Sequence, residues 1–184
     1  MNEWSRHGHL LSVSSPIDET VYGITTGFGA LANTRIRREQ ATDLQYDLLR
    51  SHAAGVGSHL DPEIVRAMLL CRARTLAQGH SGVRPEIVRY LLTLLNRNLL
   101  PAVPSQGSVG ASGDLAPFAH LALPVIGEGE ILVDGEAVPS GPVLRAAGIE
   151  PLGLLPKEGL SLLNGTEGML AHGCLAIHKA RLLV

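Results

Sequence analysis

The chain has few aromatic residues and no excess of positive charge. Its 184 residues include one tryptophan, three tyrosines and two phenylalanines, and the formal net charge is −2. Proteins that bind nucleic acids usually follow the phosphates with a basic surface and stack bases on aromatic rings. The composition therefore argues against nucleic acid as a partner.

Paired cysteines and long hydrophobic segments are missing as well. Cys71 and Cys174 form no C-x-x-C pair, which favours reduced, buried thiols over a disulfide frame or a zinc site. The charge-free stretch 115–127 is too short to span a bilayer, and residues 1–7 lack the apolar core of a signal peptide. The eight histidines show no H-E-x-x-H or comparable ligand spacing. We therefore expect a cytoplasmic protein with no metal site and no bound nucleotide.

Apolar residues at helical spacing predict a mainly α-helical fold. Helices are expected near residues 37–51, 61–78, 83–98, 115–123, 140–148 and 167–184. The Asp134-Gly135 pair lies between two short apolar runs and predicts a small hairpin over 130–138. Residues 157–166 are interpreted as a polar turn among leucines.

Three segments are expected along the chain. Residues 1–20 have weak periodicity and are interpreted as a loosely ordered lead-in. Residues 21–166 form a helical domain with long loops. Residues 167–184 begin a helix that reaches its last residue without a glycine or a capping group. An apolar helix end of this kind is expected to pack against a partner.

The most informative motif is the tripeptide Ala111-Ser112-Gly113, which lies in a glycine-rich segment. Composition alone allows an ordinary flexible loop. The spacing fits neither the G-x-S-x-G nucleophile elbow nor the G-x-G-x-x-G dinucleotide fingerprint. Because Gly113 is permissive and Ala111 is small, the Gly113 nitrogen can approach the Ala111 carbonyl carbon and close a five-membered ring. Loss of two waters, one from the Ser112 hydroxyl, leaves an electrophilic methylidene group on an imidazolone.

Four segments together resemble the histidine and aromatic amino acid ammonia-lyases. They are YGITTGFG at 22–29, SHAAGVG at 51–57, GSVGASGDLAP at 107–117 and LLNGT at 162–166. The resemblance implies the helical ammonia-lyase fold, here its N-terminal region. It also implies a self-made 4-methylideneimidazol-5-one (MIO) group formed from Ala111, Ser112 and Gly113, with Ser112 supplying the catalytic methylidene carbon.

Segments 51–55 and 107–110 are most similar to the histidine branch of that family. The resemblance implies non-oxidative deamination of L-histidine to trans-urocanate and ammonia, the first step of histidine catabolism. A phenylalanine or tyrosine ammonia-lyase, or an aminomutase, is the alternative in the same class. A catalytically silent segment that serves folding or subunit association is the alternative from another class.

The resemblance also implies a larger assembly. Family chains are much longer and form homotetramers whose sites draw on several subunits. Residues 21–166 would then be an N-terminal ammonia-lyase-like domain, and 167–184 would start a truncated helix of the central bundle. We expect the isolated chain to need a homo-oligomer or a separate C-terminal half to complete its site.

The resemblance suggests roles for four further residues, and each has a local alternative. Tyr22 resembles the proposed general base, which requires a stabilised phenolate, or it packs against the glycine loop. His52 positions the substrate imidazole or accepts a proton, or it binds the last carbonyls of a helix. Asn164 orients the MIO group and the substrate amine or carboxylate, or it caps a turn. Asp114 assists ring closure electrostatically, or it caps the helix that follows it.

Overall fold

The computed structural model describes residues 22, 26–27, 29, 32–36, 40–110 and 113–183. The expected lead-in over 1–20 lies outside the described residues. So do Ala111 and Ser112, the first two members of the tripeptide.

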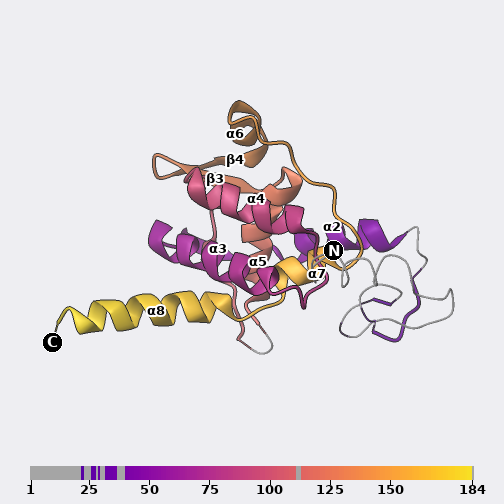
Figure 1. Cartoon of the computed structure of the whole chain (residues 1–184), viewed down its shortest axis with the longest axis horizontal. Coiled ribbons are helices and arrows are strands. Elements are labelled where there is room, and N and C mark those ends of the chain that lie inside the picture. Colours follow the sequence, from indigo (N-terminus) through magenta and orange to yellow (C-terminus); the bar gives the residue numbers. More distant parts are fainter. Residues whose placement is uncertain are drawn as a thin grey trace.

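Helices dominate the described chain, which confirms the expected mainly α fold (Figure 1). They are α2 (Ala41–His52), α3 (Pro62–Ala77), α4 (Pro85–Asn96), α5 (Leu115–Ala122), the 3-10 helix η3 (Leu123–Ile126), α6 (Ser140–Ala146), α7 (Glu158–Leu163) and α8 (Glu167–Arg181). Proline at the first turn starts both α3 and α4, where its missing N–H costs no intrahelical bond.

Two small antiparallel sheets accompany the helices. The expected hairpin is present as β3 (Glu130–Val133) and β4 (Glu136–Pro139). Its turn has φ of 51° at Asp134 and 87° at Gly135, the positive values that a tight hairpin turn requires. The sheet of β1 (Val56–His59) and β2 (Pro104–Gln106) was not expected. It pairs segments on either side of α3 and α4, so no local turn signals it.

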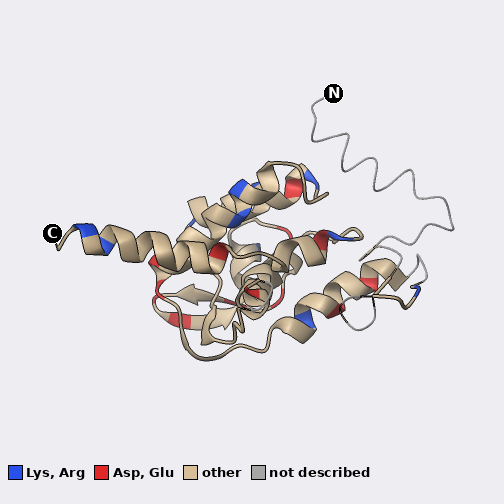
Figure 2. Cartoon of the chain, turned by 90° about the horizontal axis from the view of Figure 1, so that it is seen from below, with Lys and Arg blue, Asp and Glu red and all other residues tan. Residues whose placement is uncertain are grey.

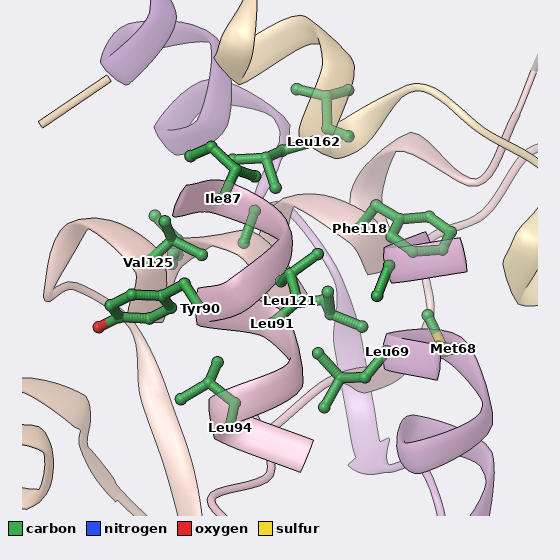
Figure 3. Close-up of a cluster of buried hydrophobic side chains, with 14 of the residues drawn as sticks. Met68, Leu69, Ile87, Tyr90, Leu91, Leu94, Phe118, Leu121, Val125 and Leu162 are labelled. Carbon is green, nitrogen blue, oxygen red and sulfur yellow. The ribbon is translucent and has the colours of Figure 1, made fainter. Parts of the chain in front are cut away.

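The hydrophobic core is built around α4. Figure 3 shows Ile87, Leu91 and Leu94 of this helix among side chains from α3, α5, η3 and α7. All three are fully buried, as are Leu69 and Phe118. The helical spacing in 83–98 therefore correctly marked the face that enters the core.

Residues 158–163 form α7, so the expected polar turn at 157–166 is wrong over most of its length. The Glu158 carboxylate is buried yet fully paired, because it accepts hydrogen bonds from Arg84 N, Nε and Nη2 and from Leu155 N, at 2.8 to 3.0 Å. A Cβ atom at Gly159 would lie 2.7 Å from Gln45 O, so α7 packs very closely on α2. These tertiary contacts stabilise a helix too short to be recognised by its period.

Helix α8 packs along α3 and then extends past it (Figure 1). Gly168 and Ala171 face the body of the molecule, whereas Cys174 is exposed. The expectation of a buried thiol is therefore wrong for Cys174. Cys71 is half-buried, and burial raises the pKa of its thiol.

Charged residues of both signs are dispersed over the helices, with Lys and Arg gathered at the end of α8 (Figure 2). None of the helices in the described part of the chain is long and apolar enough to cross a membrane. Within the same residues, no three His, Cys, Asp or Glu side chains gather as a metal site would require.

Candidate functional site

Segments 51–57 and 107–117 meet where two glycines touch. A Cβ atom at Gly107 would lie 3.0 Å from the Cα atom of Gly55, and one at Gly55 would lie 3.1 Å from His120 Nε2, so a side chain at either position would require its neighbour to shift. The Gly55 amide donates a hydrogen bond of 3.0 Å to His120 Nε2. Burial lowers the pKa of His120, which favours the neutral ring that can accept this bond.

Gly113 brings the tripeptide to the segment 162–166. A Cβ atom here would lie 2.9 Å from both Asn164 Oδ1 and Gly165 O, and φ is 139°, a value that favours glycine. The next amide, Asp114 N, donates a 2.7 Å hydrogen bond to Gly165 O. Three of the four motif segments are therefore in direct contact.

Asp114 is a junction between the glycine loop and α8. Its side chain is buried, and its two carboxylate oxygens accept hydrogen bonds from Ser108 Oγ at 2.8 Å and Met169 N at 2.9 Å. It occupies the expected N-cap position of α5, but its side chain makes no hydrogen bond to that helix. Its side chain caps the distant α8 instead, because Oδ2 accepts from Met169 N in the first turn of that helix, where negative charge is favourable.

Asn164 is the C-cap of α7, as the local alternative expected, and its side chain remains exposed. Its backbone N donates to Leu160 O at 2.9 Å and its backbone O is bound by Arg72 at 2.6 Å. The backbone thus fixes the residue, while the amide oxygen Oδ1 faces Gly113.

Arg72 was missed from the sequence. This α3 residue is 2% exposed and forms an ion pair of 2.8 Å with Glu167, which is 6% exposed. Its guanidinium also lies over the Phe118 ring, 5.2 Å from the centroid. Burial lowers its pKa, and the charge of Glu167 acts in the opposite direction. Its remaining donors bind carbonyl oxygens at the end of α7: Ser161 at 2.5 Å, Leu162 at 3.1 Å and Asn164 at 2.6 Å.

His52 ends α2 and makes the local contact expected of a helix-end histidine. Its Nδ1 lies 2.9 Å from Leu48 O and 3.2 Å from Ser51 Oγ. A carbonyl oxygen only accepts, so Nδ1 carries the proton in the first of these bonds. Nε2 of the neutral ring is then the acceptor.

Tyr22 is 49% exposed, and its hydroxyl oxygen accepts a hydrogen bond of 3.3 Å from the Gly29 amide of its own motif. The described parts of 22–36 lie beyond α2, on the opposite side of the molecule from α8 (Figures 1 and 2). The structure therefore joins the other three motif segments to one another, and the hydrogen bond of Tyr22 given above lies within its own segment.

A cavity of about 360 Å³ lies beside the Asp114 junction, within the size range of small-molecule sites. The polar residues that line it are Ser105, Ser108, Asp114 and His172, which come from β2, the segment 107–114 and α8. Leucine, proline, methionine and glycine residues make up the rest.

The family profile described as aromatic amino acid lyase matches residues 9–184. The chain belongs to the aromatic amino acid lyase family. It is 58% identical over 166 residues to histidine ammonia-lyase from Gloeobacter violaceus, a match that covers 90% of this chain and 32% of the relative. The chain thus spans about a third of the length of the curated relatives it matches.

Two solved structures of this family superpose on nearly the whole chain. Tyrosine aminomutase from Streptomyces globisporus aligns with a TM-score of 0.90 at 41% identity, over 96% of this chain and 33% of that one. Histidine ammonia-lyase from Trypanosoma cruzi aligns with a TM-score of 0.81 at 40% identity, over 97% and 33%. The helical fold described above is therefore the fold of these lyases and aminomutases over the matched third.

Proposed function

We propose that this chain contributes to an ammonia-lyase that deaminates L-histidine to trans-urocanate and ammonia. The observation that carries the proposal is the contact of Gly113 with Asn164 and Gly165, in a chain 58% identical to a histidine ammonia-lyase over 90% of its length. In the same proposal, 21–166 is an N-terminal ammonia-lyase-like domain and α8 starts a longer helix of an oligomeric bundle.

The residues around Gly113 fit an MIO group made from Ala111, Ser112 and Gly113. Ring closure needs a glycine at the third position, and the contacts with Asn164 and Gly165 leave no room for a side chain there. The Asp114 amide is already bonded to Gly165 O, which fixes the chain directly after the tripeptide. When formed, the group supplies an electrophilic methylidene carbon derived from Ser112.

The chain's own residues would bind and orient the substrate beside that carbon. Eliminating ammonia requires removal of a weakly acidic β-hydrogen and loss of a poor leaving group, so proton transfer must be well positioned. Asn164 Oδ1 can accept from the substrate amine, and His52 Nε2 can accept from the substrate imidazole. Tyr22 is the proposed general base, and Asp114 is the residue proposed to assist ring closure.

An aromatic ammonia-lyase or aminomutase is the second candidate. It is supported by the TM-score of 0.90 to a tyrosine aminomutase, against 0.81 to a histidine ammonia-lyase. These family members share the helical framework over the matched region, so the superposition alone does not distinguish their substrates. The sequence identity to the histidine enzyme decides our preference.

Intact-mass measurement tests the first step. We expect the chain to be lighter than its sequence mass by two waters. A Ser112→Ala variant should retain at least the water that the serine hydroxyl supplies, because alanine has no hydroxyl to lose. A wild-type chain with its full sequence mass would contradict the proposed chemistry in this chain.

Turnover is tested with L-histidine, L-phenylalanine and L-tyrosine, using the chain alone and the chain mixed with the downstream two thirds of the Gloeobacter violaceus enzyme. We expect urocanate from L-histidine in the mixture. Cinnamate or a β-amino acid would support the second candidate. No product from any substrate in either preparation would leave a silent segment as the remaining interpretation.

A further inference from the structure

The peptide Asn164-Gly165 is enclosed on one side by a buried ion pair. Arg72 reaches from α3 to the Asn164 carbonyl oxygen, and Glu167 holds the guanidinium from the first turn of α8. A Cβ atom at Gly165 would overlap both Arg72 Nη1 and Glu167 Oε2. The pair therefore fits a glycine at 165 and nothing larger.

Only one of the two oxygens of the Glu167 carboxylate has a hydrogen-bond partner. Oε1 accepts from Arg72, whereas Oε2 is the one buried side-chain oxygen in the described part of the chain that has no hydrogen-bond partner. An unpaired buried acceptor is unfavourable, so such a geometry persists where other contacts hold it. Here those contacts are the guanidinium on one side and Gly165 on the other.

The opposite side of the same peptide faces the tripeptide. Asn164 Oδ1 and Gly165 O both contact Gly113, and Gly165 O also accepts from the Asp114 amide. Any shift of Asn164-Gly165 is therefore transmitted directly to Gly113.

We propose that Arg72 and Glu167 are positioning residues that hold the Asn164-Gly165 peptide against Gly113 and so favour closure of the ring. This inference rests on the proposed function. Neither residue touches the reacting atoms; both act through Gly165.

A pair of glycine variants tests the inference without altering any charge. Gly165→Ala inserts a methyl group between Arg72 and Glu167, whereas Gly173→Ala, on α8, has nothing within 4 Å of the added atom. We expect hydrogen exchange at the Asp114 amide to accelerate about tenfold or more in the first variant, with no change in the amides of α4. The fraction of chains that lose two waters should fall in the same variant. Gly173→Ala should match the wild type in both measurements.

A pair of arginine variants is the second test. Arg72→Lys keeps the positive charge opposite Glu167 but removes the planar guanidinium group that donates to the carbonyl oxygens of Leu162 and Asn164. Arg74→Lys is the control, because Arg74 is an exposed residue on the same helix. We expect Arg72→Lys, like Gly165→Ala, to accelerate hydrogen exchange at the Asp114 amide and to lower the fraction of chains that lose two waters. Arg74→Lys should match the wild type in both measurements.

Three results would overturn the inference: unchanged exchange at Asp114, unchanged water loss despite faster exchange, or acceleration that is equal in α4 and at Asp114. Equal acceleration in α4 and at Asp114 would indicate a general loss of stability and not a local effect on the Asn164-Gly165 peptide. A wild-type chain that retains both waters contradicts the proposed function, and the exchange measurement alone then decides whether Arg72 and Glu167 position the peptide.

Discussion

Asp114 links the glycine loop to α8 through its two carboxylate oxygens, which bind Ser108 Oγ and Met169 N. Asp114→Ala removes both hydrogen bonds to the buried carboxylate, so we expect a loss of about 2–3 kcal/mol in the free energy of unfolding. Asp114→Asn keeps the shape and can retain both bonds, because a serine hydroxyl also accepts. This variant loses only the negative charge at the start of α8, so we expect a loss of about 1 kcal/mol in the free energy of unfolding.

Urea unfolding of the two variants checks this order, with Asp134→Asn as the control. Asp134 occupies a hairpin turn with positive φ that asparagine adopts readily, so its replacement should be close to neutral. Equal losses for Asp114→Asn and Asp114→Ala would show that the charge, and not the pair of hydrogen bonds, is what matters.

His120 makes stability depend on pH. Burial lowers its pKa below the usual 6.5, Glu130 acts in the opposite direction, and His59 adds to the lowering. The unfolded chain therefore takes up the proton first as the pH falls. The contribution of this group is complete above about pH 6.5 and is lost as the pH falls through that value towards the folded pKa.

Thermal unfolding between pH 7.5 and 5.5 tests this dependence. We expect His120→Asn to show a shallower decrease of Tm than the wild type, because the variant has no proton to take up at that position. His178→Asn, at an exposed position of α8, should keep the wild-type slope. Identical slopes for all three proteins would rule out His120 as the source.

At the scale of elements, Glu158 joins the start of α4 to α7. Its buried carboxylate accepts four hydrogen bonds, three from Arg84 and one from Leu155 N. Glu158→Gln presents an amide nitrogen to donors, so we expect a loss of about 2 kcal/mol in the free energy of unfolding. Arg84 is 34% exposed, and water partly screens its charge, which keeps the loss below that of a fully buried pair.

Glu86→Gln is the matched control on α4. Its partner Arg89 is exposed and the pair is a surface i, i+3 contact, so we expect a loss of at most about 0.5 kcal/mol in the free energy of unfolding. Chemical denaturation of both variants decides the comparison. Similar losses would mean that Glu158 adds no more than a surface charge.

The helices that the sequence predicted are those with several turns or a clear start. The pattern of 61–78 and 83–98 places proline at the first turn and leucines on one face, and α3 and α4 follow it closely. Helix α7 and the β1–β2 sheet were missed because both depend on contacts between distant segments. Helix α7 depends on the close approach of Gly159 to Gln45, and β1 is separated from its partner β2 by α3 and α4 along the chain.

The sequence predicted the motif residues of the candidate site, but not the buried ion pair that packs behind them. Asn164 and Gly113 were identified from the sequence, and the structure brings them into contact. Arg72 carried a signal that was overlooked: it follows Met68 by four residues and precedes Leu76 by four, so it lies on the buried face of α3. A charged residue in such a stripe indicates a buried ion pair, although its partner Glu167 cannot be found from spacing.

At the scale of the whole molecule, α8 presents apolar side chains to solvent. Leu170 is 50% and Ile177 61% exposed, on a helix that extends beyond the body in both views (Figures 1 and 2). Exposed apolar residues gathered on one helix favour burial against another surface. We therefore expect the chain to associate through α8, and analytical ultracentrifugation at low and high micromolar concentration measures this.

Replacing Leu170 and Ile177 together by glutamine should lower the association by about tenfold or more, because each apolar side chain buried at an interface contributes about 1 kcal/mol or more. The control is Val133→Gln, which replaces an exposed apolar side chain on β3 instead of α8 and should associate like the wild type. A chain that stays monomeric at every concentration would contradict a role for α8 in self-association. Equal weakening by both replacements would instead indicate non-specific attraction between apolar surfaces.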